Sequence, residues 1–383
     1  MKITDVKVYP IKPDIATLPS GVNVGWVFVV VETDEGIVGY GECSNWPEQG
    51  NVLVAKTVET VKETLIGQDP SHIERIWHKL YRNYTYLGSR GLITTVISGI
   101  DIALWDIKGK VLGRPVYDLL GGPVRDNLLL YTHPQYGPPE VIAASARQQV
   151  AEGYTALKTD PFWDEMARYG TAYMSGVISR RGVDRGAEIV AAIRDAVGPE
   201  VEILIDCHGN FDVASAIRCA KALAPYDITW FEEPVPPESY DALRQVRESV
   251  DVPICVGERL FTRWDFLPVL QGRLADYLMP DVCWTGGISE MKRIASMAET
   301  YYVAMSPHGA MGPIQIVAGA HAMMTVPNFY RLELVSLWTS AFNATIDPPL
   351  DIREGVLHLS DRPGLGIDLN MDYVMAHPDP GYS

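Results

Sequence analysis

Cysteine is scarce in this sequence, and no two cysteines form a recognisable motif. Only five of the 383 residues are cysteine, an odd number, and none stand as Cys-x-x-Cys. Three of them lie in apolar runs that resemble strands. This usage favours buried, reduced thiols in a cytoplasmic protein over a disulfide framework.

Long apolar runs and an excess of positive charge are also missing. No stretch approaches the ~18 apolar residues of a membrane-spanning helix, and the start, MKITDVKVYPIKPD, has no apolar signal core. The 32 lysines and arginines stand against 48 aspartates and glutamates, a net charge of −16. Nucleic acids and anionic membranes bind basic surfaces, so we expect neither as a partner. Apolar residues make up 47% of the chain, enough for the large core of a soluble protein.

The first ~125 residues predict an α+β unit. Residues 26–43 read as two strands joined by a turn at 34–36, which is a hairpin pattern. From about residue 54 the apolar spacing becomes helical and stops at Gly67. A further apolar helix follows, and Pro115 opens a short helix that Gly121 and Gly122 close.

From about residue 127 the sequence alternates between short apolar strands and helices. Eight candidate strands are NLLLYTH, ALKTD, EILIDCH, ITWFEE, PICVGE, DYLMPD, VAMSPH and FYRLE. Each is followed or ended by a polar residue, and these are His133, Lys158, Asp206, Glu232, Glu258, Asp281, His308 and Glu333. All but one of the intervals between them are 23 to 27 residues; the exception is the 48 residues between Lys158 and Asp206. This rhythm predicts an α/β barrel of the TIM type, with these side chains at its carboxyl-terminal mouth.

Strand-ending polar residues also serve as helix N-caps, which are usually Ser, Thr, Asp or Asn. The eight residues here include three glutamates, two histidines and a lysine, which capping does not explain. In a strand, residues two apart share a face, so Asp206 and His208 point to the same side. We therefore interpret the set as a functional site.

Asp206, Glu232 and Glu258 end three consecutive predicted strands and should converge. Three such carboxylates repel one another unless a proton or a cation neutralises them. All-oxygen ligands with room for water and substrate favour Mg²⁺. Zinc is disfavoured because neither a His-x-His pair nor a His-Glu-x-x-His helix is present.

Asp281 and His308 end neighbouring predicted strands, where a carboxylate would orient the imidazole as a general base. Glu333 follows on the eighth strand, and Lys158 lies on the far side. A purely structural Asp–His hydrogen bond is the alternative for the pair. A cation, an Asp-supported histidine and an opposing lysine predict abstraction of a proton next to a carboxylate.

Several motifs together resemble the enolase superfamily, and more closely the acid-sugar dehydratases of its mandelate racemase group. The motifs are LIDCHGNF, WFEEPVPPE, VGERLFTRWDF, PDVCWTGGISEMKRIASMAE and SPHGAMGPI, with ISGIDIALWDIKGK and PVYDLLGG upstream. The resemblance covers nearly the whole chain. It implies a modified (β/α)₇β barrel at residues 126–351 and an α+β capping domain at 1–125, completed by 352–383.

The resemblance also implies roles for single residues. It makes Asp206, Glu232 and Glu258 the Mg²⁺ ligands, and Asp281 with His308 the base pair. Glu333 would donate to the enediolate oxygen, and His208 would protonate the leaving hydroxyl. The expected protein is then a homo-oligomeric dehydratase that converts a sugar acid into a 2-keto-3-deoxy acid.

Three features depart from the pattern. Racemases of the group have Lys-x-Lys after the second strand, where this chain has Lys158, Thr159 and Asp160, which disfavours racemisation. Asn210 replaces the usual arginine of galactonate dehydratases, and the loop at 161–186 is unusually long. A cycloisomerase or epimerase with the same metal and base, and a non-catalytic sugar-acid sensor, are the alternatives. Two segments, 16–26 and 44–51, could close over the mouth and read the substrate.

Overall fold

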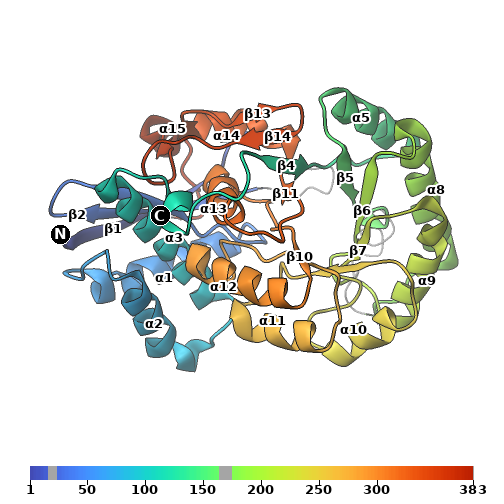
Figure 1. Ribbon diagram of the computed structural model, residues 1–383, viewed down its shortest axis with the longest axis horizontal. Coiled ribbons are helices and arrows are strands. Elements are labelled where there is room, and N and C mark those ends of the chain that lie inside the picture. Colours follow the sequence, from blue (N-terminus) through green and yellow to red (C-terminus); the bar gives the residue numbers. More distant parts are fainter. Residues whose placement is uncertain (16–23, 164–174, 383) are drawn as a thin grey trace.

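The computed structural model describes residues 1–15, 24–163 and 175–382 (Figure 1). It places an α+β unit, the cap, beside a barrel of parallel strands surrounded by helices. Within the described ranges, every helix is too short or too polar to cross a membrane. The loop predicted at 16–26 lies mostly outside these ranges, as does much of the long segment at 161–186.

The cap contains an antiparallel sheet of three strands, β1 (Ile3–Ile11), β2 (Trp26–Thr33) and β3 (Val38–Glu42). The hairpin expected at 26–43 is confirmed, with Gly36 in its turn at a φ of 76°. Alternate residues of β2 serve two cores: Val27, Val29 and Val31 pack in the cap, and Trp26, Phe28 and Val30 pack with barrel residues. The sheet therefore joins the two units through apolar contact.

The cap helices are α1 (Gly50–Leu65), α2 (Ile73–Asn83), α3 (Leu92–Leu112) and the short α4 (Val116–Leu119), with a 3₁₀ turn at Thr85–Leu87. Helix α1 starts four residues before the predicted point, and α4 lies between Pro115 and Gly121 as predicted. Helix α3 packs directly on β3, where a Cβ on Gly41 would come within 1.9 Å of the Gly99 carbonyl oxygen. Only glycine permits this approach.

The barrel has eight parallel strands, all at the predicted positions. They are β4 (Leu128–Tyr131), β5 (Ala156–Thr159), β6 (Glu202–Asp206), β7 (Trp230–Glu232), β8 (Ile254–Val256), β9 (Tyr277–Leu278), β10 (Ala304–Met305) and β11 (Leu332–Glu333). Strands β5 to β10 form one parallel sheet, and β11 pairs in parallel with β4. Two isolated bridges, Thr132 to Leu157 and Met305 to Phe329, close the ring.

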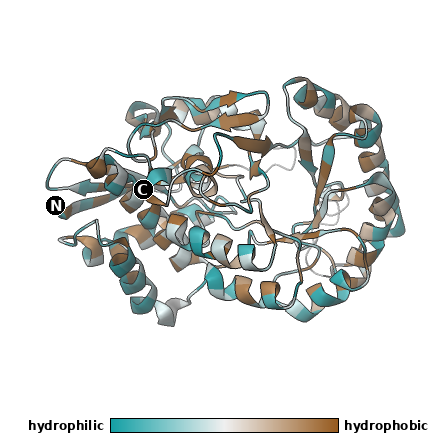
Figure 2. Cartoon of the chain, in the orientation of Figure 1, coloured by the Kyte–Doolittle hydropathy of each residue, from teal (hydrophilic) through white to brown (hydrophobic). Residues whose placement is uncertain are grey.

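Seven described helices connect the eight strands, so the (β/α)₇β order is confirmed. These helices are α5 (Pro139–Ala151), α8 (Arg180–Val197), α9 (Val213–Leu223), α10 (Tyr240–Arg247), α11 (Thr262–Gln271), α12 (Gly287–Thr300) and α13 (Pro313–Met323), with a 3₁₀ turn at Ala224–Tyr226. Figure 2 shows apolar strands inside and helices whose colours alternate between apolar and polar around them. That pattern suits helices with one face on the barrel and one in water.

The C-terminal part of the chain runs from the barrel back to the cap. After a 3₁₀ turn (Ser336–Trp338) come α14 (Thr339–Thr345), β12 (Ile346–Asp347), β13 (Asp351–Arg353), β14 (Val356–His358), β15 (Asp368–Leu369) and α15 (Met371–Ala376). Strand β14 pairs with barrel strand β4, whereas the Lys12 amide donates to the His377 carbonyl oxygen in the cap. The predicted boundary at 352 stays a prediction, because residues 352–358 extend a barrel sheet and the later residues reach the cap.

Candidate active site

Inside the barrel, an apolar layer supports a polar layer. The apolar layer consists of Tyr131, Ala156, Leu204, Trp230, Cys255 and Met279. Two residues further along five of these strands stand His133, Lys158, Asp206, Glu232 and Asp281. Because side chains two apart in a strand share a face, the strands that bury the first set carry the second set into the mouth.

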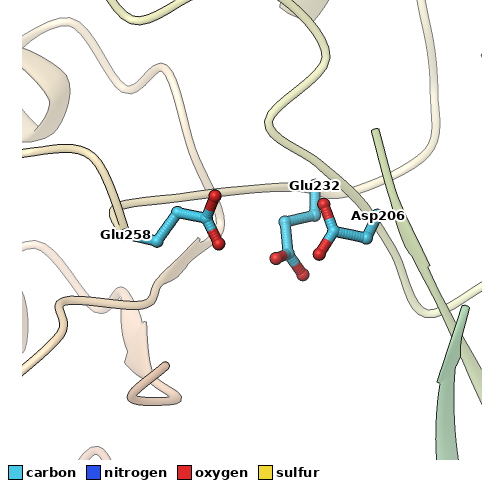
Figure 3. Close-up of side chains that lie close together, drawn as sticks. All are labelled: Asp206, Glu232 and Glu258. Atoms are coloured by element: carbon cyan, nitrogen blue, oxygen red, sulfur yellow. The ribbon is translucent and has the colours of Figure 1, made fainter. Parts of the chain in front are cut away.

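Asp206, Glu232 and Glu258 meet at this mouth (Figure 3). Asp206 and Glu232 are direct partners on the paired strands β6 and β7. One carboxylate oxygen from each of the three lies within 4.8 Å of the others, and all three residues are buried. Burial and the charge of Asp206 raise the pKa of Glu232, because both disfavour its charged form. A bound cation would stabilise that charged form. The three carboxylates therefore fit a hard divalent cation.

Lys158 lies beside these ligands, inside the barrel. Its ammonium group is 3.0 Å from Asp206 Oδ2, 2.9 Å from Glu232 Oε1 and 2.8 Å from Glu333 Oε1. Burial alone would lower the pKa of Lys158, but these carboxylates raise it well above its ordinary value. The side chain therefore remains a charged donor, and it is not poised to accept a proton from substrate.

Asp281 and His308 form the expected pair. They bridge their neighbouring strands, and His308 Nδ1 lies 2.6 Å from Asp281 Oδ2. Burial lowers the pKa of His308, yet Glu333, Asp281 and Glu258 together raise it to about 9. The Asp281 bond leaves Nε2 as the ring nitrogen that can exchange a proton with a substrate, and it lies 3.5 Å from Glu258 Oε2.

A second Asp–His pair involves Asp160, which the sequence analysis treated only as a missing lysine. His208 Nδ1 lies 3.0 Å from Asp160 Oδ2. Burial lowers the pKa of His208, but Asp206 and Asp160 raise it to about 9. These carboxylates therefore favour the protonated form of His208, the form that a general acid needs. The signal was present in the sequence, since Asp160 is two residues after Lys158 and shares its face of the strand.

Glu333 accepts hydrogen bonds rather than donating them. His133 Nε2 lies 2.7 Å from Glu333 Oε1, and the Gly309 amide donates to Oε2 at 2.9 Å. Burial raises the pKa of Glu333, but Lys158, His308 and His133 outweigh it and hold the pKa well below its ordinary value. Donation by Glu333 to an enediolate oxygen stays a prediction that would require the carboxylate first to take up a proton.

A cavity of about 380 Å³ lies over these residues. Its ionisable lining residues are His133, His208, Glu258, Arg259 and His308. Most of the remaining lining is aromatic or aliphatic and comprises Trp46, Pro134, Tyr136, Trp163, Phe261, Trp284, Ala310, Met311, Val335, Leu337 and Trp338, with Asn45 as a neutral polar member. Asn45 and Trp46 belong to the segment 44–51 that we expected near the substrate.

The structure thus brings all eight predicted site residues into one continuous cluster. The three expected metal ligands are adjacent, the Asp281–His308 pair is formed, and Lys158 and Glu333 contact each other. Their assigned roles stay predictions. His133 belongs to the strand-ending set of the sequence analysis, which assigned it no role.

Residues 2–121 match the model of the mandelate racemase / muconate lactonizing enzyme N-terminal domain, and residues 141–373 match that of the enolase C-terminal domain-like family. The chain therefore belongs to the mandelate racemase / muconate lactonizing enzyme group of the enolase superfamily.

Individual relatives are similar over almost their whole length. A D-galactonate dehydratase of Pectobacterium atrosepticum is 34% identical, with 98% of this chain and 94% of the relative covered. A D-galactarolactone cycloisomerase of Agrobacterium fabrum is also 34% identical, with coverages of 99% and 100%. A crystal structure of a mandelate racemase/muconate lactonizing enzyme-like protein from Rubrobacter xylanophilus is 37% identical, with a TM-score of 0.91 and coverages of 100% and 98%.

The carboxylate cluster generates a first prediction. Glu232→Gln removes one anionic ligand and should weaken binding of a divalent cation by about 10- to 100-fold. Isothermal titration of the metal-free protein with MgCl₂ measures this affinity. Glu233→Gln is the matched control, because Glu233 is equally buried but bonds the Gly257 amide and Arg259 instead. Equal affinities for the wild type and Glu232→Gln would contradict the assignment.

Proposed function

We propose that this protein is a Mg²⁺-dependent dehydratase that converts a sugar acid into a 2-keto-3-deoxy sugar acid. The observation that carries the proposal is the presence of two Asp–His pairs, Asp281–His308 and Asp160–His208, beside one carboxylate cluster. A β-elimination needs a base at C2 and an acid at C3, and each pair can supply one of them. Relatives 32–38% identical over most of the chain are named dehydratases of galactonate, gluconate or xylonate, which supports the proposal.

Asp206, Glu232 and Glu258 would hold the Mg²⁺ ion. When bound, the ion supplies positive charge that stabilises the extra negative charge on the substrate carboxylate after the α-proton leaves. Lys158 fixes Asp206 and Glu232 from within the barrel and adds a second positive charge next to Glu333. The residues of the chain then perform the proton transfers.

His308 Nε2 takes the α-proton, and the electrons of the C2–H bond pass into the enediolate. Asp281 keeps Nδ1 protonated and stabilises the imidazolium that forms. His208 Nε2 then donates its proton to the C3 hydroxyl, and the C3–O bond breaks to release water. The enol that remains loses its C2 hydroxyl proton and gains a proton at C3, which gives the 2-keto acid.

The other reactions of the group fit this site less well. A racemase needs a second base at C2, but Lys158 is a charged amine bonded to three carboxylates and Asp160 is bonded to His208. A cycloisomerase would use the same ligands and base, and the relative of that name keeps it as the second candidate. A homo-oligomer, a cytoplasmic location and the absence of nucleic-acid and membrane partners stay predictions from the sequence.

The base assignment predicts a specific pair of defects. His308→Asn should reduce both dehydration and exchange of the α-proton with D₂O by about 10²- to 10⁴-fold. Asp281→Asn should lower the pKa of His308, because the imidazolium loses its charged partner, so the ascending limb of the pH–rate profile moves to lower pH. Proton exchange at the wild-type rate in His308→Asn would show that another residue is the base.

The acid assignment predicts that the two steps can be separated. His208→Asn should retain α-proton exchange but lose dehydration by about 10²- to 10⁴-fold, because the base is intact and the leaving group lacks its proton. Asp160→Asn should give a milder loss of the same kind, since it lowers the pKa of His208 without removing the imidazole. Losses of exchange and dehydration in equal proportion would rule out a dedicated acid.

The lining of the cavity predicts which group the substrate carries at the end away from the metal site. Beyond Glu258, Arg259 and the three histidines, its described lining is aromatic or aliphatic, apart from the neutral Asn45. Burying a second carboxylate there without a partner costs several kcal/mol, roughly. We expect kcat/KM for an aldonate to exceed that for the aldarate of the same configuration by about 10²-fold or more. Leu337→Arg should lower this ratio of kcat/KM values. Equal values of kcat/KM for both acids in the wild type would contradict the prediction.

A further inference from the structure

Two buried carboxylates of the cap contact the first turns of two barrel helices. Glu42, at the end of β3, accepts hydrogen bonds from the amides of Gly312 at 2.7 Å and Gln315 at 2.9 Å, where α13 begins. Asp101, in α3, accepts one from the Ser289 amide at 3.0 Å, where α12 begins. Each helix lacks a side-chain cap of its own, and each carboxylate satisfies the amide of the third helical residue. Such contacts stabilise the docking of the cap.

Only the Glu42 contact continues to the base. The side-chain Nε2 of Gln315 donates to Asp281 Oδ2, the same oxygen that bonds His308 Nδ1. The Met311 amide donates to Gln315 Oε1 at 2.7 Å, which fixes the amide group in this orientation. In α12 the corresponding residue, Ser289, directs its hydroxyl back to Asp101 Oδ1 at 2.6 Å.

The same end of β3 also supports the imidazole. The Ser44 hydroxyl donates to Glu42 Oε1 at 2.6 Å, and the Ser44 carbonyl oxygen accepts from Trp284 Nε1 at 2.7 Å. The Trp284 ring lies against His308, with 5.0 Å between the ring centroids. Residues 42 and 44 of the cap thus reach both members of the base pair.

The contact between Glu42 and the start of α13 is tightly packed. A Cβ on Gly312 would come within 2.6 Å of Glu42 Oε1, so the helix start approaches the carboxylate as closely as glycine allows. Glu42, Ser44, Gln315 and Asp281 are all at most 1% exposed. A displacement of Glu42 is therefore transmitted through packed groups to Asp281, because water cannot fill the gap.

We propose that Glu42 is a positioning residue for the Asp281–His308 pair and that it acts through Gln315. Docking of the cap then orients the base. The effect on rate rests on the function proposed above, whereas the effect on the hydrogen bond between Asp281 and His308 does not.

The hydrogen bond can be observed without substrate. In protein labelled with ¹⁵N-histidine, the Nδ1 proton of His308 is assigned by the loss of its resonance in His308→Asn. Gln315→Leu removes the side-chain donor but keeps the backbone amide that bonds Glu42, and we expect it to shift this resonance. Glu42→Gln should shift it as well, and Asp101→Asn should leave it in place.

An unchanged resonance in Gln315→Leu would overturn the proposal, and this variant decides the question even if Glu42→Gln does not fold. The proposal would also be overturned if Asp101→Asn shifted the resonance as much as Glu42→Gln does. The contact with Glu42 would then only dock the cap.

Kinetics provide the second measurement. Glu42→Gln and Gln315→Leu should lower kcat by ~10-fold or more, since small displacements of a base are costly, with KM changed by less than about threefold. Asp101→Asn should lower the melting temperature about as much as Glu42→Gln and yet keep kcat within about twofold of the wild type. Equal losses of kcat in both cap variants would overturn the proposal. A wild type inactive on every sugar acid would instead refute the proposed function. The resonance of the His308 Nδ1 proton would still test whether Glu42 acts on Asp281 through Gln315.

Discussion

The site depends on the balance of charge inside the barrel. Four buried carboxylates lie close together in the barrel, those of Asp206, Glu232, Glu258 and Glu333. The protein itself supplies the Lys158 ammonium group against them, and this group contacts three of these carboxylates. Repulsion between buried carboxylates is strong at low dielectric, so the remaining negative charge suits the cluster to hold a cation. The carboxylate charges that suit the cluster to a cation also raise the pKa values of the two histidines.

The period of the barrel made most of this cluster predictable. Strands that recur about every 25 residues and end in polar residues determine which side chains meet at the mouth. Alternation within a strand then assigns Asp206 and His208 to one face, and the family resemblance agrees with both inferences. The eight strands and the three adjacent carboxylates were therefore expected before any coordinates.

The sequence did not reveal which side chains would form hydrogen bonds with one another. Asp160 could be assigned to the correct face, but its bond to His208 depends on side-chain rotamers and on the relative height of two strands. The interaction between Glu42 and the Gln315 amide joins residues 273 positions apart in two different units. No periodic pattern encodes such a contact, because it arises only when the cap packs on the barrel. The pairing of β14 with barrel strand β4 is a second contact between distant parts of the chain that no periodic pattern encodes.

One contact of the metal cluster gives the protein an optical property. The indole Nε1 of Trp230 donates to Glu232 Oε2 at 2.9 Å, and Trp230 is fully buried in the barrel interior. Indole emission responds to nearby charge, so the light from this tryptophan depends on whether the Glu232 carboxylate faces a proton, a cation or neither. The barrel thus contains an internal fluorophore one hydrogen bond away from Glu232, a predicted metal ligand, and a change in its emission on addition of MgCl₂ would report binding without any added dye.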